Sequence, residues 1–451
     1  TLPSFSFFLH LLFFLRASNS NILFEETPLS FLEQTRFKRT VKMCDAEKSI
    51  RGRLDGLMPK IMAGLGTGFD VVQYDLSVPG DSFFMSCIYY VTVRCNNRTD
   101  NHEEKTFRLI VKRPPQTDDI REFVRSDSQF YNEILFYRNY AKGSTDFPLC
   151  VYSDSTSTSK LLMVLENVGE LGYDLCPQKY DPPMEYTLAA MREIGRFHAS
   201  GYVMKEKKRK EFFDLVQNIQ EVRYQKIPDN RFEDFINLTS TRSVEYLRNK
   251  GYDMEFCDKV ETFLEKAFDN VMMKSVKPIE PLATLCHGDF TLNNTMFKRE
   301  YNSKDTCVGF KAMLIDFALI RYGSPAIDLS TFLCLHCPKL LQKDKFKDVF
   351  QVYYNSLNEY LTEHGIVDHK KYSSEALYND YKERGLFGFV IASFYLTTVM
   401  GLKALPPEEI MTMDIRDAAM ICRKDGGEEV SRILANMLLD LKEFGSLDHI
   451  I

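Results

Sequence analysis

Short runs of apolar and β-branched residues alternate with polar turns in the first part of the chain. Residues 86–93 (SCIYYVTV) and 106–111 (TFRLIV) have the composition of strands, and the polar residues 95–105 between them predict a hairpin tip. The whole region from about residue 69 to residue 111 is strand-like. Residues 161–165 (LLMVL) form a further short apolar run that predicts another strand.

The hydrophobic period then changes to that of a helix. Residues 120–140 place several apolar side chains on one broad face, with Glu133 beside them. The apolar residues of this face are Phe123, Phe130, Ile134 and Tyr137. Residues 187–200 and most of residues 206–273 also have helical spacing. The apolar run at residues 386–400 is too short for a membrane span, and we expect a buried core helix there.

These periods predict an α+β protein with two lobes. Two short apolar segments, residues 283–286 and 312–315, predict strands within an otherwise helical second part. We expect a small β-rich N-lobe over residues 43–166 and a larger, mostly helical C-lobe over residues 167–451. A cleft between two such lobes is where ligands usually bind.

The first 42 residues differ from the rest of the chain. Their apolar run (SFSFFLHLLFFL) resembles a signal peptide, but no positively charged region precedes it. The sequence begins with Thr1 and its first methionine is Met43. We expect residues 1–42 to be a translated leader or an artefact of sequence assembly, outside the fold. The alternative is a true signal peptide that lacks its first residues.

Composition narrows the classes of function. The net charge of −6 leaves no broad basic field, so we expect no nucleic-acid partner. The 11 cysteines are odd in number and irregularly spaced, which favours reduced thiols and a cytoplasmic protein. Cys334 and Cys337 form a CxxC around His336, but no second pair completes a zinc site. We expect a monomer that does not associate with a membrane.

Two motifs carry candidate chemistry. Residues 285–298 (LCHGDFTLNNTMFK) place Asn294 five positions after Asp289, and Asp316 follows a short apolar strand further on. Both motifs could be ordinary strand-and-turn sequence. They also suit phosphoryl transfer from ATP, which needs a carboxylate at the acceptor hydroxyl and oxygen ligands for Mg²⁺.

Two charged residues of the first part suit the same chemistry. Lys112 ends a strand, and Glu133 lies on the next helix. A lysine that neutralises phosphate charge and a glutamate that holds it are further parts of a phosphoryl-transfer site. Taken alone, a lysine at a strand end is usually solvated and a glutamate on an amphipathic helix usually faces water. The five parts nevertheless occur in the required order along the chain.

Several segments carry a resemblance to a known family. They are PGDSFFMS (79–86), FRLIVK (107–112), FYNEILFY (130–137), LMVLEN (162–167), GRFHAS (195–200), LCHGDFTLNNTMFK (285–298) and LIDFALIRYGSPAIDLSTFL (314–333). They resemble the aminoglycoside phosphotransferase/choline kinase branch of the protein-kinase-like fold, and within it the ecdysteroid kinase-like (CHK kinase-like) family of arthropods. The resemblance covers roughly residue 43 to the C-terminus.

The resemblance implies catalytic and metal-binding roles in the C-lobe. Asp289 resembles the catalytic base, with His287 ordering its loop. Asn294 and Asp316 resemble the Mg²⁺ ligands. Asp328 resembles a structural residue that braces the catalytic loop.

The resemblance also implies an ATP site in the N-lobe. Lys112 and Glu133 look like the phosphate-binding lysine and its partner, and Glu166 and Val168 look like the hinge whose backbone pairs with adenine. The loop over the phosphates contains Gly80, Asp81 and Ser82.

The implied function is an ATP- and Mg²⁺-dependent kinase that phosphorylates a hydroxyl of an apolar alcohol, such as an ecdysteroid, a related steroid or a xenobiotic. Thr291 and Ala318 depart from the residues common in the family and bear on substrate identity. A catalytically inactive, kinase-fold protein that binds a nucleotide or steroid is the alternative. A protein kinase is disfavoured because an extended glycine-rich loop and an APE-like motif are missing from the sequence.

Overall fold

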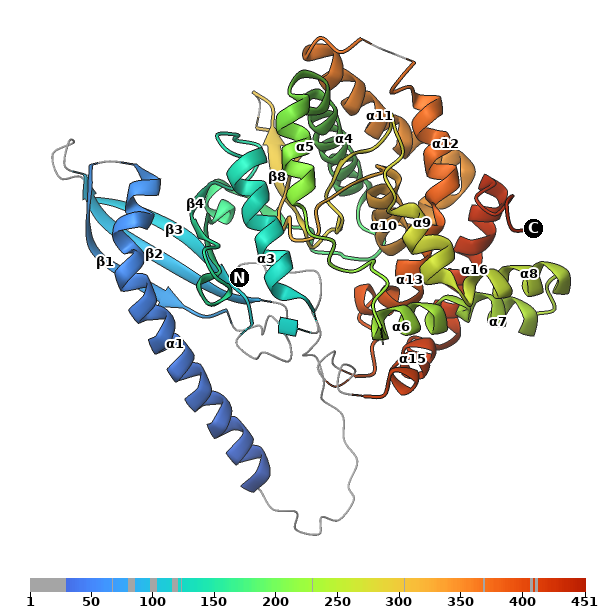
Figure 1. Cartoon of the computed structure of the whole chain (residues 1–451), viewed down its shortest axis with the longest axis horizontal. Coiled ribbons are helices and arrows are strands. Elements are labelled where there is room, and N and C mark those ends of the chain that lie inside the picture. Colours follow the sequence, from blue (N-terminus) through green and yellow to red (C-terminus); the bar gives the residue numbers. More distant parts are fainter. Residues whose placement is uncertain are drawn as a thin grey trace.

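The computed structural model has two unequal parts, a β-sheet lobe and a larger helical lobe (Figure 1). The described residues are 30–66, 68–79, 86–97, 104–115, 121–122, 124–228, 230–303, 305–367, 370–405, 409 and 413–451, with side chains from residue 48 onward. The first helix, α1 (Ser30–Leu65), begins before Met43. The division expected between residues 42 and 43 stays a prediction.

The N-lobe is built on a five-stranded antiparallel sheet with strand order β1-β2-β3-β5-β4. The strands are β1 (Phe69–Ser77), β2 (Cys87–Asn97), β3 (Glu104–Arg113), β4 (Cys150–Asp154) and β5 (Leu162–Glu166). The strands predicted at residues 86–93, 106–111 and 161–165 are therefore present. The last strand of the sheet, β5, ends at Glu166. The division into lobes at residues 43–166 and 167–451 stays a prediction.

Strand alternation separates the two faces of this sheet. Val111 of β3 and Val164 of β5 join the apolar cluster under α1, which includes Ile50 and Leu54. Successive side chains of a strand point to opposite faces. Lys112 therefore lies on the face away from α1, which is the face toward the C-lobe.

The other face of the sheet is covered by α3 (Ser126–Leu135), which continues into a π-helical turn at Phe136–Tyr140. The prediction of one helix over residues 120–140 was too simple, because Arg125 has a left-handed backbone (φ 51°) at the helix start. Phe136 in the π-helical turn stacks on Phe317 of the C-lobe, with ring centroids 3.6 Å apart. This stack joins the lobes behind the cleft.

The C-lobe is mostly helical, as expected. Its longer helices are α4 (Met184–Lys207), α5 (Arg209–Asn218), α6 (Arg231–Ser240), α7 (Arg242–Asn249), α8 (Met254–Leu264), α10 (Ala326–His336), α11 (Lys343–Glu363), α12 (Ser374–Arg384), α13 (Leu386–Val399), α15 (Ile415–Lys424) and α16 (Gly427–Phe444). Short helical turns lie at Thr158–Lys160, Val168–Leu171, Phe268–Met272, Met273–Ser275 and Pro338–Leu341.

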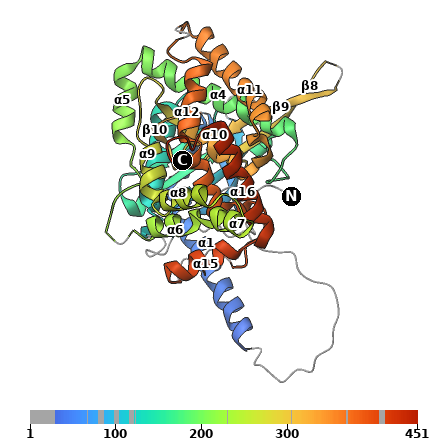
Figure 2. The same ribbon diagram turned by 90° about the vertical axis from the view of Figure 1, so that its right-hand side faces the viewer.

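In the part of the C-lobe that the structure describes, five short strands lie between the helices. They are β6 (Asp174–Leu175), β7 (Thr284–Cys286), β8 (Thr295–Tyr301), β9 (Cys307–Leu314) and β10 (Arg321–Gly323). They form a three-stranded sheet, β6-β8-β9, and a two-stranded sheet, β10-β7. The β8–β9 hairpin extends away from the body of the lobe (Figure 2). The predicted strands at residues 283–286 and 312–315 correspond to β7 and the end of β9.

The apolar run at residues 386–400 forms α13, a helix buried along nearly its whole length in the core of the C-lobe. Among the described residues, no helix is both long and apolar enough to cross a membrane. α13 approaches α10 very closely at Gly388. A Cβ atom at that position would lie 2.1 Å from the backbone oxygen of Ser330.

We expect Gly388→Ala to lower the free energy of unfolding by about 2 kcal/mol, because the added methyl group forces two packed helices apart. Gly52→Ala on α1 is the control, since a Cβ there meets nothing within 4 Å. That change should raise stability by about 0.5 kcal/mol through the better helix propensity of alanine. Urea unfolding of both variants measures the two effects, and equal stabilities would contradict this account of the packing.

Candidate active site

The HGD motif lies in the loop that joins β7 to β8, and its glycine is required by the backbone. Gly288 has φ of 80°, a left-handed conformation that favours glycine. A Cβ atom there would lie 1.9 Å from the backbone oxygen of Leu319. The loop therefore packs directly against the residues that follow Asp316, which brings the two sequence motifs together.

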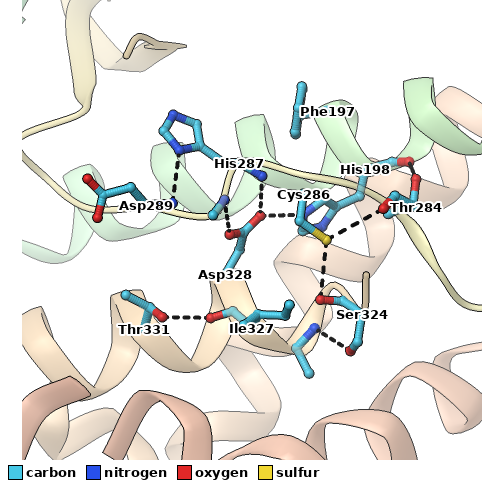
Figure 3. Close-up of polar contacts among 12 residues, drawn as sticks. Phe197, His198, Thr284, Cys286, His287, Asp289, Ser324, Ile327, Asp328 and Thr331 are labelled. Carbon is cyan, nitrogen blue, oxygen red and sulfur yellow. Dashed lines mark hydrogen bonds and ion pairs between the residues drawn. The ribbon is translucent and has the colours of Figure 1, made fainter. Parts of the chain in front are cut away.

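The Asp328 carboxylate holds this loop from below (Figure 3). Its two oxygens accept hydrogen bonds from the backbone N–H groups of His287 (2.7 Å) and Gly288 (2.8 Å). His198 of α4 contributes Nε2, 3.0 Å from Asp328 Oδ2. Burial works to raise the pKa of Asp328, but the hydrogen bonds and nearby histidines keep that pKa below its usual value. Asp328 is therefore a buried, ionised brace.

His287 connects the loop to the strand before Asp316. Its Nε2 lies 3.0 Å from the backbone oxygen of Ile315, and its Nδ1 accepts a hydrogen bond from the N–H of Asp289 (3.3 Å). Burial lowers the pKa of His287, which keeps the ring neutral. A neutral ring protonated on Nε2 satisfies both contacts, so His287 orients the loop.

A second histidine braces the far end of the loop. His336 accepts a hydrogen bond from the N–H of Leu292 (3.2 Å) through Nε2, and its Nδ1 lies 2.6 Å from the backbone oxygen of Lys179. Both ring nitrogens are engaged with the backbone, which explains the buried histidine within the CxxC segment without a metal. The cysteines among the described residues are all free.

Asp289 and Asn294 lie side by side within this braced loop. Asn294 Nδ2 donates hydrogen bonds to the backbone oxygen and to Oδ2 of Asp289, both at 3.0 Å. Asn294 Oδ1 is buried and has no hydrogen-bond partner among the described residues. A buried, unpaired amide oxygen is a fitting ligand for Mg²⁺, which prefers hard oxygen donors.

Asp316 meets the two charged residues predicted in the N-lobe. Lys112 Nζ lies 2.9 Å from Asp316 Oδ1 and 2.7 Å from Glu133 Oε2. Burial alone would lower the pKa of Lys112, but the two carboxylates raise it above its usual value. Asp316 has a left-handed backbone (φ 65°), which is uncommon for a residue other than glycine and is typical of functional sites.

A cavity between the lobes gathers four of the predicted side chains, and we name it the ionic cavity. Its lining includes Lys112, Glu133, Asp289 and Asp316, together with Arg223. Burial and the nearby Asp316 raise the pKa of Asp289 to about 7, whereas the positive charge of Arg223 opposes this rise.

The other predicted ATP-binding residues lie at the crossing between the lobes or outside the described residues. Glu166 ends β5 and pairs with Leu109 of β3, and the buried Val168 begins the next helical turn. Gly80, Asp81 and Ser82 lie outside the described residues. Ala318 lines the ionic cavity, and Thr291 is fully buried.

A second cavity, which we name the aromatic cavity, is also lined by Asp289. Its lining residues are Arg223, Tyr224, Gly288, Asp289, Thr331, Phe387, Ile391, Phe394 and Tyr395. Asp289 and Arg223 line both cavities. In Figure 3 the Asp289 carboxylate points away from Asp328. A third hollow, against the β8–β9 hairpin and α4, shares no residue with these two.

Sequence analysis identified neither Arg223 nor the aromatic cavity. The helix at residues 386–400 was predicted as core only, because nothing in its apolar run separates residues that fill the core from residues that line a cavity. Arg223 belongs to no motif. Its only local signal is the break in helical spacing before Pro228, which predicts a connecting segment.

A buried lysine that joins a glutamate of one lobe to an aspartate of the other is the arrangement of protein-kinase-like phosphotransferases, and the fold is of that class. Residues 79–366, well over half of the chain, match the ecdysteroid kinase-like family, and the chain belongs to this family. The resemblance derived from the sequence motifs is therefore confirmed.

Solved structures of small-molecule kinases are among the matches. A microcompartment-associated aminopropanol kinase is 11% identical, with 86% of this chain and 98% of that chain covered and a TM-score of 0.36. An aminoglycoside phosphotransferase from Alicyclobacillus acidocaldarius is 13% identical, with coverages of 82% and 94% and a TM-score of 0.26. No curated protein matches the chain.

We expect Asp328→Asn to lower the free energy of unfolding by about 3 kcal/mol. The NH2 group of an asparagine side chain cannot accept a hydrogen bond, so one of the two backbone N–H groups would lose its acceptor. Asp348→Asn, on the exposed side of α11, is the matched control and should change stability by less than about 0.5 kcal/mol. Chemical denaturation of both proteins tests the brace. Equal stabilities of the two variants would show that Asp328 does not hold the loop.

Proposed function

We propose that the protein is an ATP- and Mg²⁺-dependent kinase that phosphorylates a hydroxyl of an apolar alcohol. Membership of the ecdysteroid kinase-like family supports a phosphotransferase that acts on small molecules. The observation that carries the proposal is the position of Asp289, which lines both the ionic and the aromatic cavity. A carboxylate between a charged site and an apolar site suits transfer of a charged group to an apolar acceptor.

The ionic cavity provides what the phosphates of ATP require. Lys112 is buried and positively charged, and Glu133 fixes its ammonium group from α3. Asn294 Oδ1 and the Asp316 carboxylate would hold Mg²⁺, which when bound neutralises charge on the phosphates. The hinge at Glu166 and Val168, and the loop that contains Gly80, Asp81 and Ser82, would complete the nucleotide site.

Asp289 is suited to act as the base. Asn294 Nδ2 holds one of its carboxylate oxygens, which restricts rotation of the side chain. The pKa of about 7 shows that its surroundings favour proton uptake more than water does. A base with that property can accept the proton of an acceptor hydroxyl as the oxygen attacks phosphorus.

The aromatic cavity indicates the class of acceptor. Phe387, Ile391, Phe394 and Tyr395 project from α13, so most of the wall is apolar or aromatic. Thr331 and the Tyr395 hydroxyl provide a few polar groups, the usual composition of a small-molecule site. The lining matches the apolar chemistry of an ecdysteroid, a related steroid or a hydroxylated xenobiotic. The cavity must widen to admit a molecule of that size, because it now has room for about one water molecule.

A catalytically inactive binding protein is the second candidate derived from the sequence, but no structural observation favours it. Lys112, Asp289, Asn294 and Asp316 are all present and lie in or beside one cavity. A protein that only held a nucleotide or a steroid would need no carboxylate that lines both cavities.

The proposal is tested by measuring ATP consumption with Mg²⁺ against ecdysteroids, plant sterols, phenolics and choline. Phosphorylation of one compound, identified by mass spectrometry, would establish the acceptor class. ATP binding without turnover of any compound would favour the nucleotide-binding protein. Failure to bind ATP would exclude the kinase and the nucleotide-binding protein and would leave the steroid-binding protein as the candidate.

We expect Asp289→Asn to lower kcat by about 10³-fold or more while ATP affinity changes little, because the base acts on the acceptor. Calorimetry with Mg²⁺ and ATP measures binding, and initial rates measure turnover. Wild-type rates in the variant would remove Asp289 from the mechanism.

We expect Asp316→Ala to weaken binding of the metal-nucleotide complex by about tenfold or more, because it removes an anionic ligand for Mg²⁺. ATP titrations with Mg²⁺ and with EDTA separate the two contributions. The wild type should bind more tightly with the metal and the variant should show little difference. A metal dependence that survives in Asp316→Ala would contradict the assignment.

A further inference from the structure

Arg223 lies where the two cavities meet. It belongs to the segment of residues 219–228 that connects α5 to α6, and its half-buried side chain lines both the ionic and the aromatic cavity. Asp289 is the other charged residue shared by the two linings. One carboxylate residue and one arginine therefore border the region that a group transferred between the cavities would cross.

The backbone of this segment is held by α3. Asn132, fully buried on α3, donates from Nδ2 to the backbone oxygen of Gln220 and accepts from the Gln220 N–H, both at 2.8 Å. Arg125, immediately before α3, donates to Gln225 at 2.7 Å. The segment that carries Arg223 is thus fastened to the helix that carries Glu133.

The segment is also fixed from within the C-lobe. Glu221 Oε1 accepts from the backbone N–H groups of Arg223 (2.8 Å) and Tyr224 (2.9 Å), and Glu221 Oε2 pairs with Arg321 (3.2 Å). The Arg321 guanidinium also lies 4.8 Å from the centre of the Tyr224 ring. These contacts fix the backbone at Arg223 in the absence of a substrate. Electrostatic catalysis requires preorganised donor groups, and a fixed backbone limits the positions that the guanidinium can take.

The chemistry of arginine suits this position. A guanidinium is planar, always charged and able to donate two parallel hydrogen bonds to phosphoryl oxygens. Lys112, the other cation of the ionic cavity, is already engaged by Glu133 and Asp316 at the inner end. Arg223 lies nearer the aromatic cavity, and its positive charge is felt at Asp289, where the acceptor would stand.

We propose that Arg223 is a catalytic residue that binds the phosphoryl group while it passes from ATP to the acceptor. The inference rests on the proposed kinase function. In the step, the acceptor oxygen forms a bond to the γ-phosphorus and the bond from that phosphorus to the β,γ-bridging oxygen breaks. The acceptor proton moves to Asp289, and ADP leaves with the bridging oxygen. Arg223 balances the negative charge of the transferring oxygens and is itself unchanged.

The test compares binding of ADP, which lacks the transferring phosphoryl group, with binding of ADP and aluminium fluoride, which together imitate that group during transfer. Dissociation constants for ADP with Mg²⁺, and for ADP with Mg²⁺ and aluminium fluoride, are measured in the full-length wild type, Arg223→Ala and Arg125→Ala. Arg125 is the matched control, because it contacts the same segment but lines neither cavity. Thermal unfolding shows whether each variant is folded.

We expect Arg223→Ala to bind ADP with an affinity within about threefold of that of the wild type. Aluminium fluoride should increase the affinity of this variant about 10²-fold less than it increases that of the wild type, because that is the typical effect of removing one donor to an oxyanion. Guanidinium ion at millimolar concentration should restore part of that loss. Arg125→Ala should keep the additional affinity. An additional affinity within threefold of the wild type in Arg223→Ala would overturn the inference.

The kinase proposal is tested by separate arms of the same experiment. Absence of ADP and ATP binding in the wild type would count against the kinase and leave nothing for Arg223 to act on. Nucleotide binding by the wild type, with additional affinity that Arg223→Ala retains, would keep the kinase and reject the role of Arg223. Arg223→Lys distinguishes charge from geometry, since a lysine keeps the charge but lacks the planar fork.

Discussion

The position of the candidate active site depends on one buried carboxylate. Asp328 accepts two backbone N–H groups of the loop that precedes Asp289 and contacts His198, whose other ring nitrogen lies 3.0 Å from the Tyr353 hydroxyl. A buried charge is stable only when its hydrogen-bonding capacity is used, so these elements are held in one relative placement. The loop and α4 therefore meet the ionised Asp328 of α10 directly, and α11 is joined to it through His198.

A second set of contacts sets the distance between the lobes. Lys112 of β3 reaches both Glu133 of its own lobe and Asp316 of the other, and the stacked rings of Phe136 and Phe317 lie behind this ion cluster. The charged contact is directional and the aromatic contact buries apolar surface. The larger apolar core runs from α13 into α3 and Met163 of β5, so it is shared by the two lobes, and a smaller core lies under α1. The ion cluster and the ring stack therefore lie where one continuous core crosses between the lobes.

The local sequence was sufficient to predict those elements whose signal lies within a few neighbouring residues. The strands β2, β3 and β5 follow from runs of β-branched and aromatic residues, and the loop of Asp289 follows from a motif with fixed spacing. The break in the helix at residues 120–140 was not predicted, because the left-handed Arg125 has no signal in hydrophobic period. Arg223 and Tyr395 were missed for a different reason: their approach to Asp289 depends on packing between segments distant in sequence.

The reciprocal hydrogen bonds between Asn132 and Gln220 have a consequence for control of the protein. Asn132 precedes Glu133 on α3, so a rotation of this helix that separated Glu133 from Lys112 would also break two buried hydrogen bonds to the C-lobe. We therefore expect α3 and the segment at Gln220 to move together. The Lys112–Glu133 ion pair and the segment that carries Arg223 are thus linked through α3, so a displacement of either one would be transmitted to the other.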